Sequence, residues 1–360
     1  MAKPVFIAGS GLLCARGDSP STVRDALWAG ECTAASWQLG ERRFPYFPLP
    51  LPETDWLRRA ELAIRHVGGQ LGNVPVETPL FVASSSFQIG HFEQQGAPFA
   101  MPAGSASFTR QLADWLGLRG PRYSFSNACV SGFSAIDAAS TLIAAGLIDE
   151  ALVLGVEFAN RSTLAGFAAM ELLSPDAGRP FDARRDGLVL GEAVAVVRLS
   201  ARVGPWQIAG QRNGLDGYSA TGPDPAGAPI ARVMSDCLHA AGLTPADIDV
   251  VKVQAAGSPG TDLAEARALH QVFGPAMPPL LSLKPALGHT LGASGIAELA
   301  ALLACLEAGQ LPATAQFAKI DADIGLTPTP HRQAADVRHA LLNLIGFGGG
   351  LASLIVTRTR

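Results

Sequence analysis

The sequence predicts an α/β fold in which helices cover mainly buried sheets. Short runs of aliphatic and β-branched residues alternate with longer Ala- and Leu-rich segments along most of the 360 residues, a pattern typical of layered α/β proteins. Hydrophobic residues make up 48% of the chain and charged residues only 16%, which indicates a globular protein with a large core. A strand-and-turn pattern at Val5–Gly9 returns at Trp206–Gly210, so we also expect two similar halves.

The first half contains four runs that predict strands: Val5–Gly9, Arg122–Ser126, Leu152–Val156 and Val194–Leu199. Phe133–Ala145 is rich in Ala, Ile and Leu and is followed by Gly146, a combination that predicts a helix with a glycine cap. The Pro-rich segment Arg42–Leu57 predicts a surface loop.

The second half repeats this alternation. Its predicted strands are Trp206–Gly210, Val250–Gln254, Leu342–Gly346 and Leu351–Val356, and its predicted helices are Ile230–Ala241, Thr261–Phe273 and Ile296–Ala308. Gly222–Pro229 predicts a second surface loop. Val203-Gly204-Pro205 is suited to the connection between the halves, so we divide the chain into residues 1–203 and 204–360.

Composition argues against several classes of function. The net charge of −4 provides no strong field for nucleic acid or a membrane surface. The most apolar segments are interrupted by Glu298 or by glycines, and the N-terminal residues lack the long apolar stretch of a signal peptide. The five cysteines have no CxxC spacing, which argues against a zinc site or a disulfide framework and favours the reducing cytoplasm; they are Cys14, Cys32, Cys129, Cys237 and Cys305.

Cys129 is the first candidate for chemistry. It lies in the segment Asn127–Gly132, between a predicted strand and a predicted helix. At a helix N-terminus the peptide dipoles favour thiolate over thiol, and a thiolate at a turn is a nucleophile that a substrate can reach. The alternative is a small core residue, which is what most free cysteines are.

Two further segments suit a catalytic site. In Ser282–Gly295, His289 follows Lys284 and lies between two glycines at a strand-to-helix turn, a better place for catalysis than a core histidine usually has. Gly346–Gly350 combines Phe347 with four glycines, so its backbone amides can approach a ligand closely. The alternative for this loop is a plain tight turn between strands.

With Cys129 in its segment, these motifs resemble the β-ketoacyl-acyl-carrier-protein synthases of the elongating kind, in the thiolase-fold superfamily. The resemblance covers essentially the whole chain and keeps the order of the motifs. The matching segments are Val5–Gly11, Asn127–Gly132, Arg179–Glu192, Lys284–Gly295 and Gly346–Gly350. The resemblance implies a thiolase fold, with two duplicated βα halves in a layered α-β-α-β-α arrangement.

The resemblance also implies roles for these residues. Cys129 would accept an acyl group from a carrier protein as a thioester. The backbone amides of Cys129 and Phe347 would form an oxyanion hole, and Phe347 would gate the site on its glycine hinges. His289 would stabilise the enolate that decarboxylation of the second substrate leaves, and Lys284 would tune His289 electrostatically.

Partners follow from the same resemblance. Acyl groups would arrive on the phosphopantetheine of an acyl carrier protein, with no other cofactor and no metal. A dimer, with an identical or a paralogous chain, would form at Arg122–Ser126. Glu192 and Asp186 would be supporting residues or an ordinary ion-pair network. Three arginines on one predicted helix are candidates for binding the acidic carrier, with a solvated face as the alternative: Arg58, Arg59 and Arg65.

The chain departs from the family pattern at Gln254. The family has its first catalytic histidine there, in an HGTGTP-type turn, whereas this chain reads Gln254-Ala255-Ala256 before Gly257. Glutamine can donate a hydrogen bond but cannot act as a general base near neutral pH. The stretch from Ala60 to Phe108 is also shorter than in relatives, so we expect a reshaped acyl pocket or dimer surface.

Two functions of different class therefore remain. The first is an enzyme that loads an acyl group on Cys129 and condenses or transfers it. The second is a subunit like the chain-length factors, which pair with an active ketosynthase and shape its tunnel. The retained cysteine favours the first, and Gln254 favours the second. A thiolase or a coenzyme-A-using initiating synthase is a third alternative, which Lys284 before Gly288-His289-Thr290 disfavours.

Overall fold

A computed structural model describes residues 3–52, 54–96 and 101–359, without the side chains of residues 101–104. Its main feature is a ten-stranded sheet whose strands run in the order β5-β4-β6-β8-β1-β9-β15-β14-β10-β11. The N-terminal half supplies β1 (Phe6–Cys14), β4 (Leu80–Ala83), β5 (Arg122–Phe125), β6 (Glu150–Glu157) and β8 (Ala193–Ser200). The C-terminal half supplies β9 (Trp206–Leu215), β10 (Val250–Lys252), β11 (Leu280–Leu281), β14 (His339–Ile345) and β15 (Gly350–Arg358).

The two halves repeat one topology. In the first half, β1 pairs antiparallel with β8 and β8 antiparallel with β6, while β6, β4 and β5 are parallel. In the second half, β9, β15 and β14 are antiparallel in the same succession, and β14, β10 and β11 are parallel. A two-residue antiparallel pairing of β1 with β9 joins the halves. The expectation of two duplicated βα halves is confirmed by this order.

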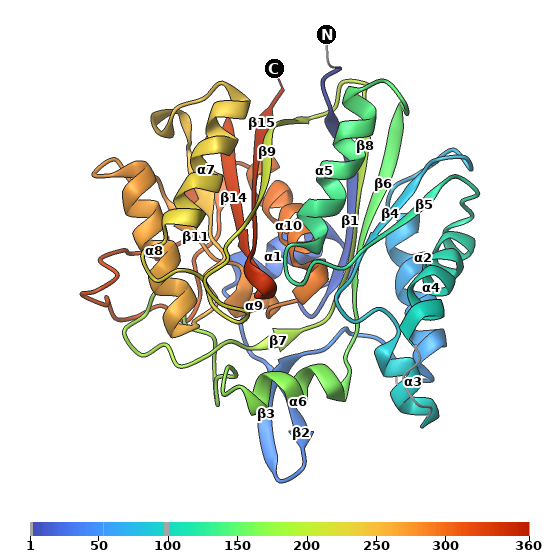
Figure 1. The fold of residues 1–360 in the computed structure, drawn as a ribbon, viewed down its shortest axis with the longest axis horizontal. Helices are drawn as coiled ribbons and strands as arrows, with labels where there is room; N and C mark the ends of the chain where they lie inside the picture. Colours follow the sequence, from blue (N-terminus) through green and yellow to red (C-terminus); the bar gives the residue numbers. More distant parts are fainter. Residues whose placement is uncertain (1–2, 53, 97–100, 360) are drawn as a thin grey trace.

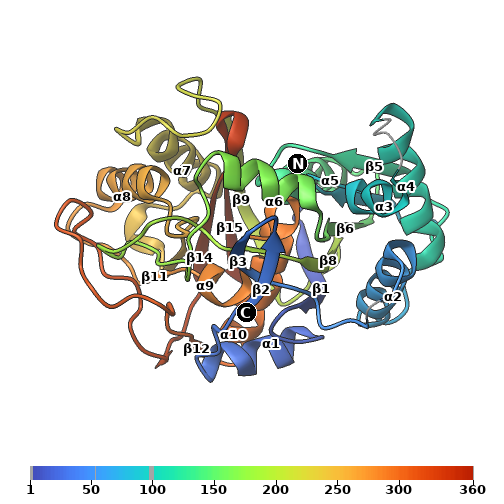
Figure 2. The same cartoon turned by 90° about the horizontal axis from the view of Figure 1, so that it is seen from below.

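The helices complete the layers (Figure 1). The outer face of the first half carries α2 (Trp56–Gly69) and α4 (Met101–Leu116), and the outer face of the second carries α7 (Ala228–Ala241) and α8 (Pro259–Phe273). Between the halves lie α5 (Ser131–Ala144) and α10 (Ser294–Glu307), which pack on each other. Seen from below, α1 (Pro20–Trp28) lies beside α10 (Figure 2). This is the α-β-α-β-α arrangement of the thiolase fold.

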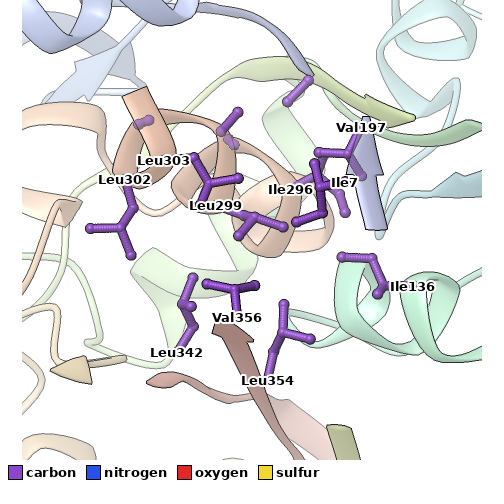
Figure 3. Packing of buried hydrophobic residues seen from close by; sticks show 14 of the residues in the cluster. Ile7, Ile136, Val197, Ile296, Leu299, Leu302, Leu303, Leu342, Leu354 and Val356 are labelled. Carbon is purple, nitrogen blue, oxygen red and sulfur yellow. The ribbon is translucent and has the colours of Figure 1, made fainter. Parts of the chain in front are cut away.

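The core is centred on α10. Ile296 and Leu299 of this helix pack in one cluster with Val197 of β8 and with Leu342 and Leu354 of the second half (Figure 3). Every residue of α10 before Glu307 is buried, and all of these except Ser294 and Glu298 are apolar, as is typical of a central helix. The central layer thus fixes how the two halves face each other.

A second, small sheet lies below the layers and corrects one prediction. The segment Arg42–Leu57 is a loop only in its middle, at residues 48–52 and 54–55. Its first residues form β3 (Arg42–Phe47), which pairs with β2 (Ala35–Leu39) and β7 (Leu190–Gly191), and its last two residues begin α2. Pro45 indicated a loop, but the residues on either side of it, Phe44 and Tyr46, are buried in the hydrophobic cluster that contains Cys129. Tertiary packing here outweighs the local proline signal.

The other predicted elements are confirmed, with shifts of a few residues at their ends. Gly222–Pro229 is a loop up to Gly227, and α7 takes the last two residues. The remaining elements are α3 (Ile89–Gln95), α6 (Arg161–Ala169), α9 (Lys284–Leu287), β12 (Gln310–Leu311), β13 (Gln333–Ala334) and three 3₁₀ turns, Pro245–Asp247, Leu291–Ala293 and Phe347–Gly349. Among the described residues, no helix is long and apolar enough to span a membrane.

Candidate active site

Cys129 lies in a tight turn between the end of β5 and the start of α5. The residue before it, Ala128, has a positive φ of 46°, a conformation that costs energy outside glycine. Ser131 stabilises the turn, because its hydroxyl accepts from the Asn127 amide at 2.8 Å and donates to the Ala128 carbonyl at 2.6 Å. The turn presents Cys129 at the N-terminal end of the central helix.

His289 lies opposite this turn, between α9 and α10. Its Nε2 is 3.0 Å from Cys129 Sγ, and its Nδ1 is 3.0 Å from Ser294 Oγ. Gly292 explains part of the placement, since a Cβ at this position would lie 2.5 Å from the Ser85 amide nitrogen of the first half. The two halves of the chain therefore meet at a cysteine–histidine pair.

The electrostatics make both partners neutral at rest. Burial raises the pKa of the Cys129 thiol to about 12, although the Lys284 ammonium and the Phe347 amide act to lower it. Burial, together with Lys284, lowers the pKa of the His289 imidazole to about 3. The expectation of a resting thiolate is therefore wrong, because loss of solvent outweighs the helix N-terminus. With this protonation, the thiol donates to Nε2, and Nδ1–H donates to Ser294.

Phe347 closes the site from a third side. Its backbone amide, like that of Cys129, interacts with the Cys129 sulfur. Its ring stacks on Phe167 of α6, with ring centroids 5.2 Å apart and an angle of 16° between the planes. Gly349 has a φ of 77°, and a Cβ there would lie 1.8 Å from the Asp216 carbonyl oxygen, so only glycine fits this part of the loop.

Gln254 lies on the same pocket as Cys129 and His289. Its backbone amide donates to Glu265 Oε1 at 2.7 Å, which fixes the turn after β10. Its side chain is only 4% exposed, and its Oε1 is buried without a hydrogen-bond partner. An amide with an unused acceptor, facing a pocket, has the capacity to bind a substrate group.

The pocket itself is narrow. Its volume is about 40 Å³, which leaves space for a few water molecules at most and none for an acyl chain. Cys129 is 5% exposed. Entry of a substrate therefore requires movement of the lining. Residues around the cavity include Cys129, Phe167, Leu172, Leu188, Thr221, Gly222, Pro223, Gln254, Ser258, Thr261, His289 and Phe347.

The Lys284 ammonium pairs with Glu298 of α10 and acts on His289 through its charge. The other oxygen of Glu298 accepts from Lys252 Nζ at 2.5 Å, and all three side chains are buried. Burial acts to raise the pKa of Glu298, but the two lysines lower it to about 2. Sequence reasoning misses Glu298 and Lys252 as site residues. Each is a charged residue in an otherwise apolar run, and this contrast is the one sequence signal that could have indicated them.

The two supporting residues lie away from this pocket. Glu192 accepts from Arg59 at 2.6 Å and from the Leu49 and Ala159 amides at 2.7 Å, so it joins α2 to the small sheet and β6. Asp186 accepts from the Ser174 hydroxyl at 2.7 Å. Because Arg59 pairs with Glu192, it does not contribute to a free basic face.

Arg58 and Arg65, the other arginines of that face, both pair with Glu61, which reduces their net charge. No group of three or more His, Cys, Asp or Glu side chains in the described part of the chain is arranged to hold a metal ion. All five cysteines are free thiols.

Comparisons with known proteins identify the family of the chain. The profile of the β-ketoacyl synthase N-terminal domain matches residues 69–202, and that of the C-terminal domain matches residues 207–318. The 3-oxoacyl-[acyl-carrier-protein] synthase 2 of Rhizobium meliloti is 33% identical over 290 residues, which cover 75% of this chain and 67% of the relative. The corresponding Mycobacterium leprae protein is 35% identical over 240 residues, covering 62% of this chain but only 57% of the relative's length.

Solved structures show the same fold over the full length. A chain from the complex of a ketosynthase with its chain length factor from Xenorhabdus doucetiae superposes with a TM-score of 0.86 at 25% identity, covering 99% of this chain and 98% of the other. A β-ketoacyl synthase from Burkholderia phymatum gives a TM-score of 0.84 at 26% identity, covering 99% and 100%. The fold is that of a thiolase-fold protein, and its two halves meet at a cysteine–histidine pair. The chain belongs to the β-ketoacyl synthase family.

Proposed function

We propose that this protein is an acyltransferase of carrier-protein-dependent fatty acid or polyketide synthesis, with an acyl thioester on Cys129. The observation that carries the proposal is the 3.0 Å contact between Cys129 Sγ and His289 Nε2, on the pocket that Phe347 and Gln254 also line. A merely structural cysteine has no need of an imidazole held by a second hydrogen bond at its far nitrogen.

The chemistry follows from these contacts. His289 Nε2 accepts the thiol proton as the sulfur attacks the thioester carbonyl of the incoming acyl group. The imidazole then returns that proton to the carrier sulfur as the carbon–sulfur bond of the incoming thioester breaks. The oxyanion of the tetrahedral intermediate would lie between the amides of Cys129 and Phe347, where one such donor contributes about 3 kcal/mol. Gln254 can donate to the carbonyl of a second substrate but cannot supply a base or a positive charge, so condensation by the chain alone would be slow.

The test is direct acylation. The protein is incubated with an acyl carrier protein loaded with a saturated acyl chain, and Cys129 is examined by peptide mass spectrometry. We expect an adduct of the acyl mass on Cys129 and none on Cys32, whose sulfur contacts Gln316 in a different region. The Cys129→Ser variant is the matched control and should carry no thioester.

A second candidate function is a chain-length-factor-like subunit that pairs with an active ketosynthase. Two observations favour it: Gln254 stands where the family has a catalytic histidine, and the pocket, at about 40 Å³, is too small for an acyl chain. The Xenorhabdus doucetiae structure that this chain resembles is a ketosynthase with its chain length factor. Absence of any Cys129 adduct, with activity appearing only on co-expression with a second ketosynthase, would establish this candidate and exclude the first.

The remaining elements of the proposal concern partners. Acyl groups would arrive on the phosphopantetheine of an acyl carrier protein, without another cofactor. A homodimer or a heterodimer with a paralogous ketosynthase would form along β5, which in the described structure pairs only with β4 and has exposed residues at Arg122–Ser124. An edge strand exposes unpaired backbone N–H and C=O groups, which a strand of a second chain would pair.

The halves 1–203 and 204–360 would each contribute one face of the site. The free thiols favour a cytoplasmic location.

A further inference from the structure

Lys252 is a fully buried lysine for which the proposed reaction gives no role. It lies on β10, two residues before Gln254, and alternate residues of a strand point to the same face. The exposed fraction of its side chain is 0%. Burial of an ammonium is costly unless the charge is paired, so its partners are informative.

Its partners connect the two sides of the pocket. Lys252 Nζ donates to Glu298 Oε2 at 2.5 Å and to the Asn343 carbonyl at 3.2 Å. Glu298 also pairs with Lys284, in the motif that carries His289. The Asn343 side chain donates to Glu265 Oε1 at 2.6 Å, and that carboxylate accepts from the Gln254 amide at 2.7 Å.

The charges around this network are unequal. Lys252 of β10 and Lys284 of α9 share a single carboxylate, Glu298 of α10, so this triad has a net charge of +1. Glu265 of α8 lies beyond Asn343, and Glu157 of β6 faces the site from the first half and acts to raise the Cys129 pKa. Burial and the Lys284 charge lower the pKa of Lys252 itself to about 8, while Glu298 opposes this shift.

We propose that Lys252 is a positioning residue of the site: its positive charge shares Glu298 with Lys284, and so leaves an uncompensated cation beside the Cys129–His289 pair. With Lys252 present, Glu298 cannot neutralise Lys284 completely. The remaining positive charge at Lys284 favours an anion at Cys129 and disfavours protonation of His289. Lys252 and Lys284 both act on His289 in this direction, against Glu298. The role of Lys252 in catalysis rests on the proposed acyl chemistry, but the experiment that tests its effect on Cys129 does not require that chemistry.

The test measures alkylation of Cys129 by iodoacetamide between about pH 6 and pH 9, with peptide mass spectrometry as the readout. Wild type is compared with Lys252→Gln, which keeps a hydrogen-bond donor but removes the charge, and with Lys252→Met, which removes both. At about pH 6 to 7 we expect both variants to alkylate Cys129 about three- to tenfold more slowly, because loss of one nearby charge shifts a thiol pKa by roughly half a unit to one unit. The difference should shrink towards pH 9, because the pKa of Lys252 is lowered to about 8 and wild type then loses this charge itself.

Cys32 is the internal reference in every sample, and Lys3→Met, at an exposed lysine that pairs with Asp149, is the matched control. Both should react as in wild type. Equal Cys129 rates in wild type and Lys252→Gln would overturn the proposal, including the case in which only Lys252→Met is slow, because a hydrogen bond rather than a charge would then explain the effect. Alkylation requires no carrier protein, so failure of acyl transfer would leave this result independent.

Discussion

The two halves of the molecule share one topology and differ in what they place at the start of the central helix. In the first half, the turn before α5 carries Cys129, fixed by the Ser131 hydroxyl. In the second half, the segment before α10 carries His289, fixed by Ser294. The same position in a duplicated scaffold thus supplies the sulfur from one side and the imidazole from the other.

The halves also differ in how charge is buried. The triad Lys252–Glu298–Lys284 is entirely within the second half, under the pocket. The first half buries Glu157, whose carboxylate accepts from Ser85 and Ser86 and from Gly292 across the boundary. Glu157 of the first half is thus held by neutral donors, whereas Glu298 of the second half is held by two ammonium groups. This contrast teaches that the second half supplies the positive charge, and the first half both the nucleophile and an opposing carboxylate.

The largest expected effect is an increase in the rate of decarboxylation. Gln254→His restores a base at the end of β10, and a positioned base contributes on the order of a hundred- to ten-thousand-fold in rate. We expect release of CO₂ from a malonyl carrier thioester to rise by that factor, measured with the purified protein. Gln254→Asn is the control and should leave the rate low. Equal rates for wild type and Gln254→His would show that the residue at position 254 does not limit the rate of decarboxylation.

The second effect concerns stability. Glu298→Gln leaves two buried ammonium groups without a counterion, and removing one partner of a buried ion pair costs about 3–5 kcal/mol. Chemical denaturation should show this loss of unfolding free energy. Glu192→Gln is the comparison within the first half; Arg59 keeps an 18% exposed side chain and can be partly solvated. A cost at Glu192 equal to that at Glu298 would contradict the contrast between the halves.

A comparable or slightly smaller effect is expected for His289→Ala. Loss of one preorganised hydrogen-bonding group lowers the rate of a step of this kind by roughly a hundred- to a thousandfold. The rate of Cys129 acylation from an acyl carrier protein, followed by intact-mass spectrometry, measures it. Replacement of a histidine outside the site, His339→Ala, should have no effect. An undiminished rate in His289→Ala would mean that the second half contributes no chemistry to acyl loading.

The smallest expected effect concerns access to the narrow pocket. Phe167 of the first half stacks on Phe347 of the second, and an aromatic pair of this kind contributes about 0.5–1.5 kcal/mol. Phe167→Leu should therefore open the pocket and raise the alkylation rate of Cys129 about two- to tenfold. Phe92→Leu, in α3, serves as a control for loss of a ring elsewhere. An unchanged rate would place the barrier to entry at another contact.

Much of this molecule could be predicted from local patterns. Alternation of apolar residues located the strands and the helices Thr261–Phe273 and Ile296–Ala308 within a few residues, because each buries one face or all faces in a core. The turn at Cys129 was evident from glycine and β-former patterns. The strand Arg42–Phe47 was missed, because Pro45 indicated a loop while burial of Phe44 depends on residues far along the chain.

The sequence by itself determined the layered α/β class, the duplicated order of elements, and Cys129 and His289 as candidates, since periodicity and turn chemistry are local. Their assignment to one site followed from the family resemblance. Only the tertiary structure decided that Cys129 is a buried thiol rather than a thiolate, and that Lys252 and Glu298 belong to the site. Solvent exclusion and pairing between residues 46 positions apart depend on how the halves close on α10, and no local pattern contains that information.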